Sequence, residues 1–301
     1  LNCMKKILFS AILVIFSLSE TVFAQDDLMK MALQSADSGS TKVMATFKGT
    51  KLISAQTNET VHKRTLDFRV GHLFGNVGKE SHGGAHTFYG LDASADIRIA
   101  FDYGITDKLA IGISRSKRQE NFEGLIKYRL LEQTTDNKIP LAVTVFINAA
   151  MTAVENNDVL IYPKTTDRLS YTSQLILARK FSSRISIALL PTLIHRNFVF
   201  DANDHNDIFA LGGGGRFRIT RSSCFIVDYF YNFDRLRKLD NGYWYNPLGV
   251  GAEIETGGHV FTIMFTNASG IIENDFIPNT TDSWSKGGFK LSFNISRNFK
   301  L

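Results

Sequence analysis

Two stretches of the chain bring together residue types that bind metal ions. His82 and His86 flank three small residues, and imidazole nitrogens are common ligands of transition metals. The stretch 201–207 is rich in aspartate and asparagine, whose oxygens suit calcium, but it lacks the central glycine and the twelfth-position glutamate of an EF-hand. Because exposed loops are polar by default, the sequence predicts no metal ion and no other cofactor, and both stretches stay open as candidates.

Residues that could act in catalysis occur without partners at a recognisable spacing. His195 and His259 are expected near strand ends, where a lipase would also need a serine and an orienting polar residue, and no motif supplies them. Cys224 is expected to be a small buried residue rather than a reactive thiol. The glycines 212–215 are not followed by the Lys-Ser/Thr of a phosphate-binding loop, so they favour a close backbone approach in a strand. The sequence therefore predicts no catalytic residue and no enzyme.

The elements that position the charged residues follow a period of two. Between 289 and 301, apolar residues occupy the odd positions, except at Arg297, and polar residues occupy the even ones. Such alternation predicts a β-strand with one apolar and one polar face. The same reading along the chain predicts about twelve strands, near 65–75, 93–105, 108–116, 121–132, 139–151, 168–181, 184–196, 206–219, 223–234, 246–255, 258–268 and 286–301.

The N-terminus carries the pattern of an exported protein. Lys5 and Lys6 precede an apolar run over 7–18 and a small-residue site ending at Ala24, which predicts a secretory signal peptide over 1–24. Beyond it, no apolar run is long enough for a membrane-spanning helix. Export combined with alternation favours a membrane β-barrel, and a soluble β-sheet protein is the alternative.

The predicted connections differ at the two ends of the strands. Compact turns alternate with connections that are mostly longer and more polar, at 76–92, 117–120, 152–167, 197–205, 235–245 and 269–285, of which 117–120 is the short exception. Short periplasmic turns and long extracellular loops are typical of an all-β, antiparallel up-and-down transmembrane barrel of the outer membrane. Both chain ends would then lie on the periplasmic side.

The predicted organisation has three parts: a signal peptide over 1–24, a short N-terminal periplasmic or plug segment over 25–60, and an outer-membrane β-barrel over 61–301. The middle part carries Phe47, Leu52 and Ile53, apolar residues that would be poorly placed in a free tail. This favours packing in the lumen or under the rim.

The polar face of each strand turns toward the lumen in a membrane barrel. The charged residues there have both signs, which argues against strong selection of one ion type. The formal net charge of +5 comes from scattered basic residues, so no nucleic-acid partner is predicted. The residues predicted to line the lumen are Asp67, Arg69, Asp96, Arg98, Asp102, Glu123, Lys127, Arg129, Arg168, Arg216, Arg218, Asp228 and Glu253.

The sequence resembles a family of uncharacterised outer-membrane β-barrels typical of Bacteroidota, a domain of unknown function. The resemblance implies a barrel located in the bacterial outer membrane, and no reaction. The stretches that carry it are Ala45 to Ile53, Leu66 to Gly75, Phe88 to Asp92, Asp102 to Leu109 and Lys127 to Leu131.

Two functions remain open at this stage. The polar lumen favours a porin-like channel or transporter for small solutes; the alternative is a closed structural or docking barrel that engages another cell-envelope protein. Expected partners are outer-membrane lipid and either a small solute or an envelope protein. The sequence leaves open which solute or partner binds, whether the lumen is open or plugged, and how many copies assemble.

Overall fold

The computed structural model describes residues 41–301, except 158–160, 202–203, 235–237, 240–241 and 257. The predicted signal peptide and the part of the N-terminal segment before residue 41 lie outside the described residues.

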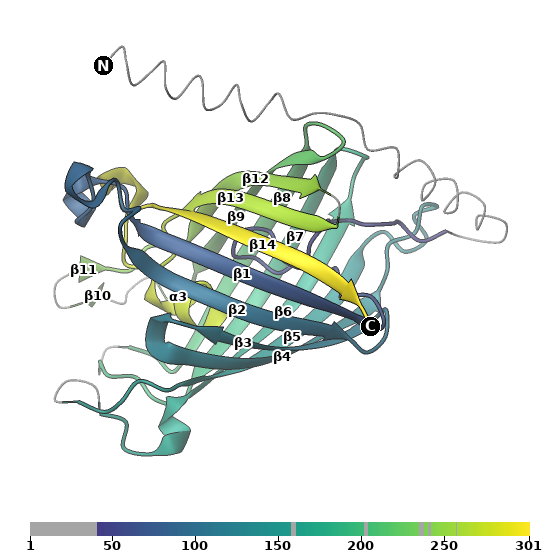
Figure 1. The fold of residues 1–301 in the computed structure, drawn as a ribbon. Coiled ribbons are helices and arrows are strands. Elements are labelled where there is room, and N and C mark those ends of the chain that lie inside the picture. Colours follow the sequence, from purple (N-terminus) through teal and green to yellow (C-terminus); the bar gives the residue numbers. More distant parts are fainter. Residues whose placement is uncertain (1–40, 158–160, 202–203, 235–237, 240–241, 257) are drawn as a thin grey trace, which may run out of the picture. The chain divides into compact units, whose positions relative to one another are not determined.

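Twelve antiparallel strands form a closed barrel, in which each strand pairs with its neighbours in sequence and β1 pairs with β14 to complete the wall (Figure 1). A small hairpin of β10 (Lys238–Leu239) and β11 (Gly242–Tyr243) lies in the connection after β9, outside the barrel sheet. The barrel strands are β1 (Thr65–Asn76), β2 (Ser94–Gly104), β3 (Leu109–Ser116), β4 (Asn121–Leu131), β5 (Ala142–Thr152), β6 (Leu169–Lys180), β7 (Ile185–Arg196), β8 (Asp207–Arg218), β9 (Ser223–Asn232), β12 (Leu248–Thr256), β13 (His259–Thr266) and β14 (Lys290–Lys300).

The wall is apolar outside and polar inside. In β2, Asp96 and Arg98 are 0% and 3% exposed, whereas their neighbours Ile99 and Phe101 are 44% and 42% exposed. Large apolar side chains are exposed in the same alternating way on the other strands. A soluble sheet protein would bury these side chains, because exposing them to water is unfavourable. The prediction of an all-β membrane barrel is confirmed.

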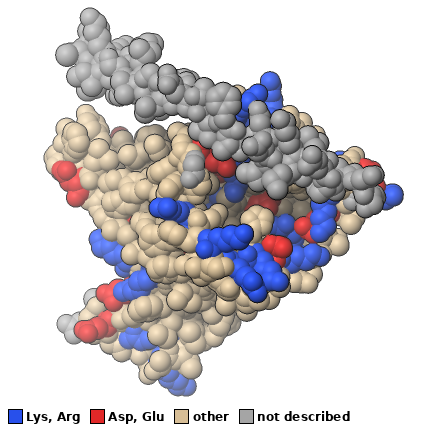
Figure 2. Space-filling view, turned by 45° about the vertical axis from the view of Figure 1, so that its right-hand side comes forward, with Lys and Arg blue, Asp and Glu red and all other residues tan. Residues whose placement is uncertain are grey.

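The two rims differ as predicted. At one rim, strands are joined by the short turns 105–108, 181–184, 219–222 and 257–258 and by the longer turn 132–141, whereas the other rim carries most of the long connections. Thr65 pairs with Lys300, so both ends of the barrel sheet lie at the rim with the tight turns, which is the periplasmic one. In Figure 2, lysine and arginine side chains occur in separate groups across the visible face, and uncharged residues cover much of the surface between them.

Short helices occur in the long connections. Among the residues described, no helix combines the length and apolarity needed to cross a bilayer. The helices are η1 (Lys79–Ser81), η2 (Ala85–Thr87), η3 (Arg118–Glu120), η4 (Thr165–Arg168), α3 (Glu273–Asn279) and η5 (Trp284–Lys286).

Two parts of the chain run inside the barrel. We call residues 42–62, which precede β1, the inner segment, and residues 267–289, which join β13 to β14, the outer loop. Phe47 and Leu52 of the inner segment and Phe276 of the outer loop are each 1% exposed or less, and they belong to one apolar cluster with residues of the wall. The apolar core of this protein therefore lies in the lumen, where inward-facing wall residues such as Phe146, Leu190 and Phe230 form most of it.

Candidate functional site

The inner segment forms a tight turn in the middle of the barrel. Lys51 and Gln56 form an antiparallel bridge, and the Leu52 amide donates to the Ala55 carbonyl at 2.9 Å. The Thr57 amide donates to the Thr50 carbonyl at 3.0 Å. These bonds satisfy backbone groups that would otherwise be buried without partners, and they let the turn keep its shape without joining the barrel sheet.

The wall is shaped to receive this turn. The amides of Ser54 and Ala55 donate to one carboxylate oxygen of Asp228, at 2.6 and 2.7 Å. A Cβ atom added to Gly214 would come within 2.6 Å of the Leu52 side chain, a distance that real Cβ atoms essentially never show. The glycine therefore provides a close approach that larger residues would block.

A second glycine continues this surface. A Cβ atom on Gly249 would lie 2.6 Å from the Ile53 side chain and 2.8 Å from Asp228 Oδ1. Together, Gly214, Gly249 and Asp228 form what we call the turn-binding surface of the wall. It provides two hollows for apolar side chains and one anionic acceptor for backbone amides, which match the tip of the turn.

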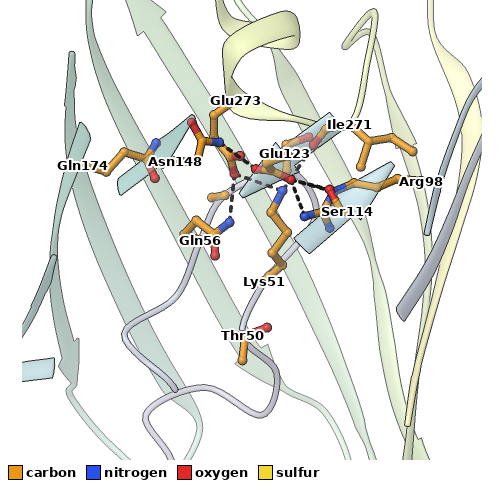
Figure 3. Close-up of polar contacts among 12 residues, drawn as sticks. Thr50, Lys51, Gln56, Arg98, Ser114, Glu123, Asn148, Gln174, Ile271 and Glu273 are labelled. Carbon is orange, nitrogen blue, oxygen red and sulfur yellow. Dashed lines mark hydrogen bonds and ion pairs between the residues drawn. The ribbon is translucent and has the colours of Figure 1, made fainter. Parts of the chain in front are cut away.

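The turn also meets the outer loop, and we call this contact the junction. Lys51 Nζ lies 2.9 Å from Glu273 Oε1 and donates to the Ile271 carbonyl at 3.2 Å. Gln56 Nε2 donates to the same Glu273 oxygen at 3.1 Å. Figure 3 shows Lys51 and Gln56 extending from the inner segment toward Glu273. The side chains of Lys51 and Glu273 are 4% and 0% exposed, so each charge depends on its partner for compensation.

Charged residues of the wall surround the junction. Arg98 Nη2 and the Ser114 hydroxyl each donate to Glu123 Oε2 at 2.6 Å, and Asn148 Nδ2 donates to the other Glu123 oxygen at 2.7 Å (Figure 3). Glu123 therefore takes its hydrogen bonds from three side chains of the wall, and the positive charge of Lys51 in the inner segment also stabilises its negative charge.

Lys127, by contrast, connects the wall to the inner segment. Its Nζ donates to the Thr50 carbonyl at 2.9 Å and to Gln56 Oε1 at 3.1 Å. Hydrogen bonds from a charged donor are stronger than neutral ones, so this lysine fixes the turn from the side opposite Asp228.

Apart from Asp102, the other residues predicted to line the lumen fall into three groups. Some contact the inner segment or the outer loop, some pair within the wall, and two lie at the rims. In the first group are Asp228, Arg69, which donates to Thr50 Oγ1 at 2.6 Å, Arg129, which pairs with Glu59 at 3.2 Å, and Asp96, which accepts from the Ile271 amide at 3.1 Å. In the second are Asp67 with Arg69 at 2.8 Å and Arg216 with Glu253 at 3.0 Å. Asp102 is buried beside Gly112, Arg168 ends η4 at the loop rim, and Arg218 ends β8 at the turn rim.

The inner segment begins at the periplasmic rim with an ion pair. Lys42 Nζ lies 2.6 Å from Glu132 Oε2, and Arg129 lies 3.2 Å from the other oxygen of that carboxylate. Glu132 follows β4, outside the membrane-spanning strands. Partial burial raises the pKa of this carboxyl, but the two cations outweigh it and hold the pKa below its usual value.

Sequence reasoning did not single out the residues that make the junction. Glu273 lies in a connection that was expected to be an external polar loop, yet Ile272, Phe276 and Ile277 of that connection are buried. Three large apolar residues close together in a supposed external loop are the signal that could have revealed it. Neither Lys51 nor Gln56 stands out, because nothing in the local sequence says which lysine of the inner segment will be buried.

The described structure brings together no metal-binding cluster, and it places neither His195 nor Cys224 in a catalytic triad. In the part of the chain that the structure describes, no group of three or more histidine, cysteine, aspartate or glutamate residues could hold a metal ion. His195 Nδ1 lies 2.7 Å from Asp207 on the outer face, and no described hydroxyl is hydrogen-bonded to it. Cys224 is buried.

Comparison with solved structures identifies porins and channels of similar architecture. The NanC porin is 10% identical, with 78% of this chain and 100% of that chain covered, and a TM-score of 0.48. The KdgM porin is 7% identical over 79% and 99% of the two chains, with a TM-score of 0.44. An outer membrane channel from Pseudomonas putida F1 is 12% identical over 80% and 98%, with a TM-score of 0.46. No curated protein matches the sequence.

The family comparison covers most of the chain. Residues 47–299 match the model described as Membrane bound beta barrel domain (DUF5777), which includes the turn of the inner segment, the outer loop and nearly all of the barrel. Closed antiparallel barrels with an even number of strands are the membrane-spanning folds of the bacterial outer membrane. The resemblance expected from the sequence is confirmed at the level of the family, while the Bacteroidota origin stays a prediction. The protein is a bacterial outer-membrane β-barrel and belongs to the membrane-bound β-barrel domain family DUF5777.

Proposed function

We propose that the protein is a channel or transporter for small solutes, and that displacement of the inner segment opens its lumen. The observation that carries this proposal is the way the inner segment is held. It packs against apolar wall residues and is otherwise held by individual hydrogen bonds and the junction, not by a strand pairing in the barrel sheet. Such contacts can break one by one without opening the barrel.

The proposal includes the domain organisation, partners and chemistry predicted from the sequence. Residues 25–60 would act as a plug and 61–301 as the barrel, with the lumen-lining charges exposed to solute once the plug leaves. Outer-membrane lipid would cover the exposed apolar belt, which includes Ile113 at 66% and Phe122 at 53% exposure. The protein would act by passage of solute and not by catalysis. The docking alternative is not favoured, because no described surface identifies an envelope protein as its partner.

A reversible disulfide tests the proposal. A Cβ atom on Gly214 would lie 3.8 Å from the Ala55 Cβ, which is about the mean separation in disulfides. The variant Ala55→Cys with Gly214→Cys, in a background carrying Cys3→Ser and Cys224→Ala, should therefore close under oxidation and lock the turn to the wall. The far end of the flexible Leu52 side chain must shift to admit the new Cβ.

The readout is ion conductance in planar bilayers and uptake of small sugars and amino acids by liposomes. We expect passage in the reduced form and none in the oxidised form, and each single-cysteine variant should be insensitive to oxidation. Equal passage in the reduced and oxidised forms would mean that the protein is a channel but that displacement of the inner segment does not open it. If solute passes through neither the reduced nor the oxidised form, and also not through a variant in which a Gly-Ser linker replaces residues 45–57, the channel function itself is refuted.

A further inference from the structure

A cavity of about 370 Å³ opens at the loop rim, above the lumen. Its lining comes from the connections β3–β4, β5–β6, β7–β8 and β9–β12 and from α3. Figure 1 shows α3 at the end of the barrel away from the C-terminus. The size falls within the range of about 300–1,000 Å³ that is typical of small-molecule sites. A ligand in this cavity would touch the helix that begins with Glu273 of the junction.

One wall of the cavity is aromatic. The rings of Tyr162 and Phe200 lie 5.0 Å apart and edge to face, and Phe198 packs at 5.1 Å from Phe200. Phe200 remains 49% exposed although it lines a concave surface. The rings hold one another in place, so they offer a preformed apolar surface that a flat C–H face of a ligand can cover.

Planar polar groups beside these rings are already fixed. Arg168 donates to the carbonyls of Thr152 and Val154 and to Asn156 Oδ1, and its guanidinium lies 4.7 Å above the Tyr162 ring. Arg118 Nε lies 2.8 Å from Asp275 Oδ2. These contacts reduce the conformational entropy that binding would otherwise cost.

At the α3 side of the cavity, the amide oxygen of Asn274 has an unsatisfied hydrogen-bonding capacity within the described structure. Asn274 is 6% exposed, and its Nδ2 donates to Ser170 at 3.1 Å. Its Oδ1 is buried and has no hydrogen-bond partner in the described part of the chain. A buried acceptor without a partner is costly, and a ligand hydroxyl that reached it after a small side-chain rotation would remove that cost.

The charges of the lining nearly balance. The three arginines 118, 168 and 196 face the four aspartates 167, 201, 204 and 275, and Arg196 pairs with Asp204 at 2.7 Å. A net anionic or cationic ligand would meet as much repulsion as attraction here. A ligand whose groups both donate and accept hydrogen bonds, and which also has an apolar face, suits all of the walls at once.

We propose that this cavity binds a neutral saccharide, with a sugar ring stacked on Phe200 and its hydroxyls bonded to Arg168, Asp275 and Asn274. The proposal rests on the proposed function because it names the class of solute, but its test measures binding and not passage. Binding without passage would refute the channel alone, and passage without binding would refute this site alone.

The experiment uses the full-length protein in detergent micelles. The probes are glucose, maltose and maltotriose, with glucuronate and glucosamine as the anionic and cationic counterparts of glucose, and binding is measured by calorimetry. The chain has two tryptophans, of which Trp244 lines the cavity and Trp284 stacks on Phe289. A change in tryptophan fluorescence on sugar binding should therefore disappear in Trp244→Phe and persist in Trp284→Phe.

Two variants probe the walls. Phe200→Ala and Arg168→Gln should each weaken binding about tenfold, the loss of roughly one aromatic contact or hydrogen bond. Phe181→Ala and Arg179→Gln are the matched controls, because Arg179 lies 5.2 Å above the Phe181 ring in a similar pair at the opposite rim; they should leave binding unchanged. Folding of each variant is checked by circular dichroism.

Three outcomes would overturn the proposal. The first is no binding of any neutral sugar at millimolar concentration. The second is binding of glucuronate or glucosamine that is about tenfold tighter than binding of glucose, which would identify a site for ions. The third is unchanged sugar binding in folded Phe200→Ala and Arg168→Gln proteins, which would place the sugar elsewhere.

Discussion

The inner segment and the outer loop fill the same lumen, but the chain holds them differently. The outer loop is joined to barrel strands at both ends, β13 and β14, whereas the inner segment continues into a barrel strand only at β1. The outer loop thus has two fixed ends, and the inner segment depends on Asp228, Lys127 and the junction to stay in place. This difference in attachment is why we propose that the inner segment, and not the outer loop, is the releasable element.

The largest effect should come from removing the releasable element. Replacement of residues 45–57 by a Gly-Ser linker of equal length removes the turn and all of its wall contacts, so we expect stepwise conductance in planar bilayers. The same replacement of residues 273–279 should give a smaller conductance, because the inner segment would still cross the lumen. If the α3 replacement conducts more than the segment replacement, the assignment of the two roles is reversed.

The junction joins the two elements, and breaking it should loosen both. Glu273→Ala leaves Lys51 buried without its partner, which typically costs about 3–5 kcal/mol. Hydrogen exchange of the Leu52 and Thr57 amides should therefore accelerate. The double variant Lys51→Met with Glu273→Leu should recover much of the protection, because apolar pairs can replace buried ion pairs. Equal exchange in wild type and Glu273→Ala would mean that the junction does not hold the turn.

A smaller effect is expected at the turn-binding surface. Gly214→Val places methyl groups where Leu52 lies, and overpacking of this kind costs about 1–3 kcal/mol. Gly213→Val is the matched control, because a Cβ there meets no atom within 4 Å. Protection of the Ser54 and Ala55 amides should fall only in the first variant. Equal protection in both would mean that the wall does not select the shape of the turn.

The smallest effect concerns the periplasmic end of the inner segment. The pKa of Glu132 is depressed by Lys42 and Arg129 despite partial burial, so its stabilisation is present above the usual glutamate pKa of about 4.3. It is lost as the pH falls through the lower, folded-state value. Protection of the Val43 amide, which donates to the Gln133 carbonyl, should fall modestly in acid. Glu132→Gln should remove this pH dependence, and an unchanged profile would exclude Glu132 as its source.

The wall could be predicted from the sequence because each strand encodes its two faces locally. All twelve barrel strands were expected, and the errors lie at their ends. A strand was predicted from 139, but β5 begins at Ala142, since Pro140 cannot donate to a neighbouring strand. A strand was predicted from 286, but β14 begins at Lys290, because Gly287 has a positive φ of 70° and ends η5.

The contents of the lumen could not be predicted in the same way. The inner segment and the outer loop have no period of two, and their contacts join residues far apart in sequence, such as Gln56 and Glu273 at a separation of 217 positions. Alternation gives the face on which Asp228 lies, but not that two amides will occupy its carboxylate. That the charges of the wall meet a solute stays a prediction.

The apolar tip of the inner segment also sets how long an opening can last. When the turn leaves Gly214 and Gly249, Leu52 and Ile53 move from buried hollows into water, and each exposed side chain costs about 1.5–3 kcal/mol. In the proposed open state, exposure of these two side chains therefore favours return of the turn to the wall, independently of any ligand or partner. We therefore expect the open state to be short-lived and to close spontaneously.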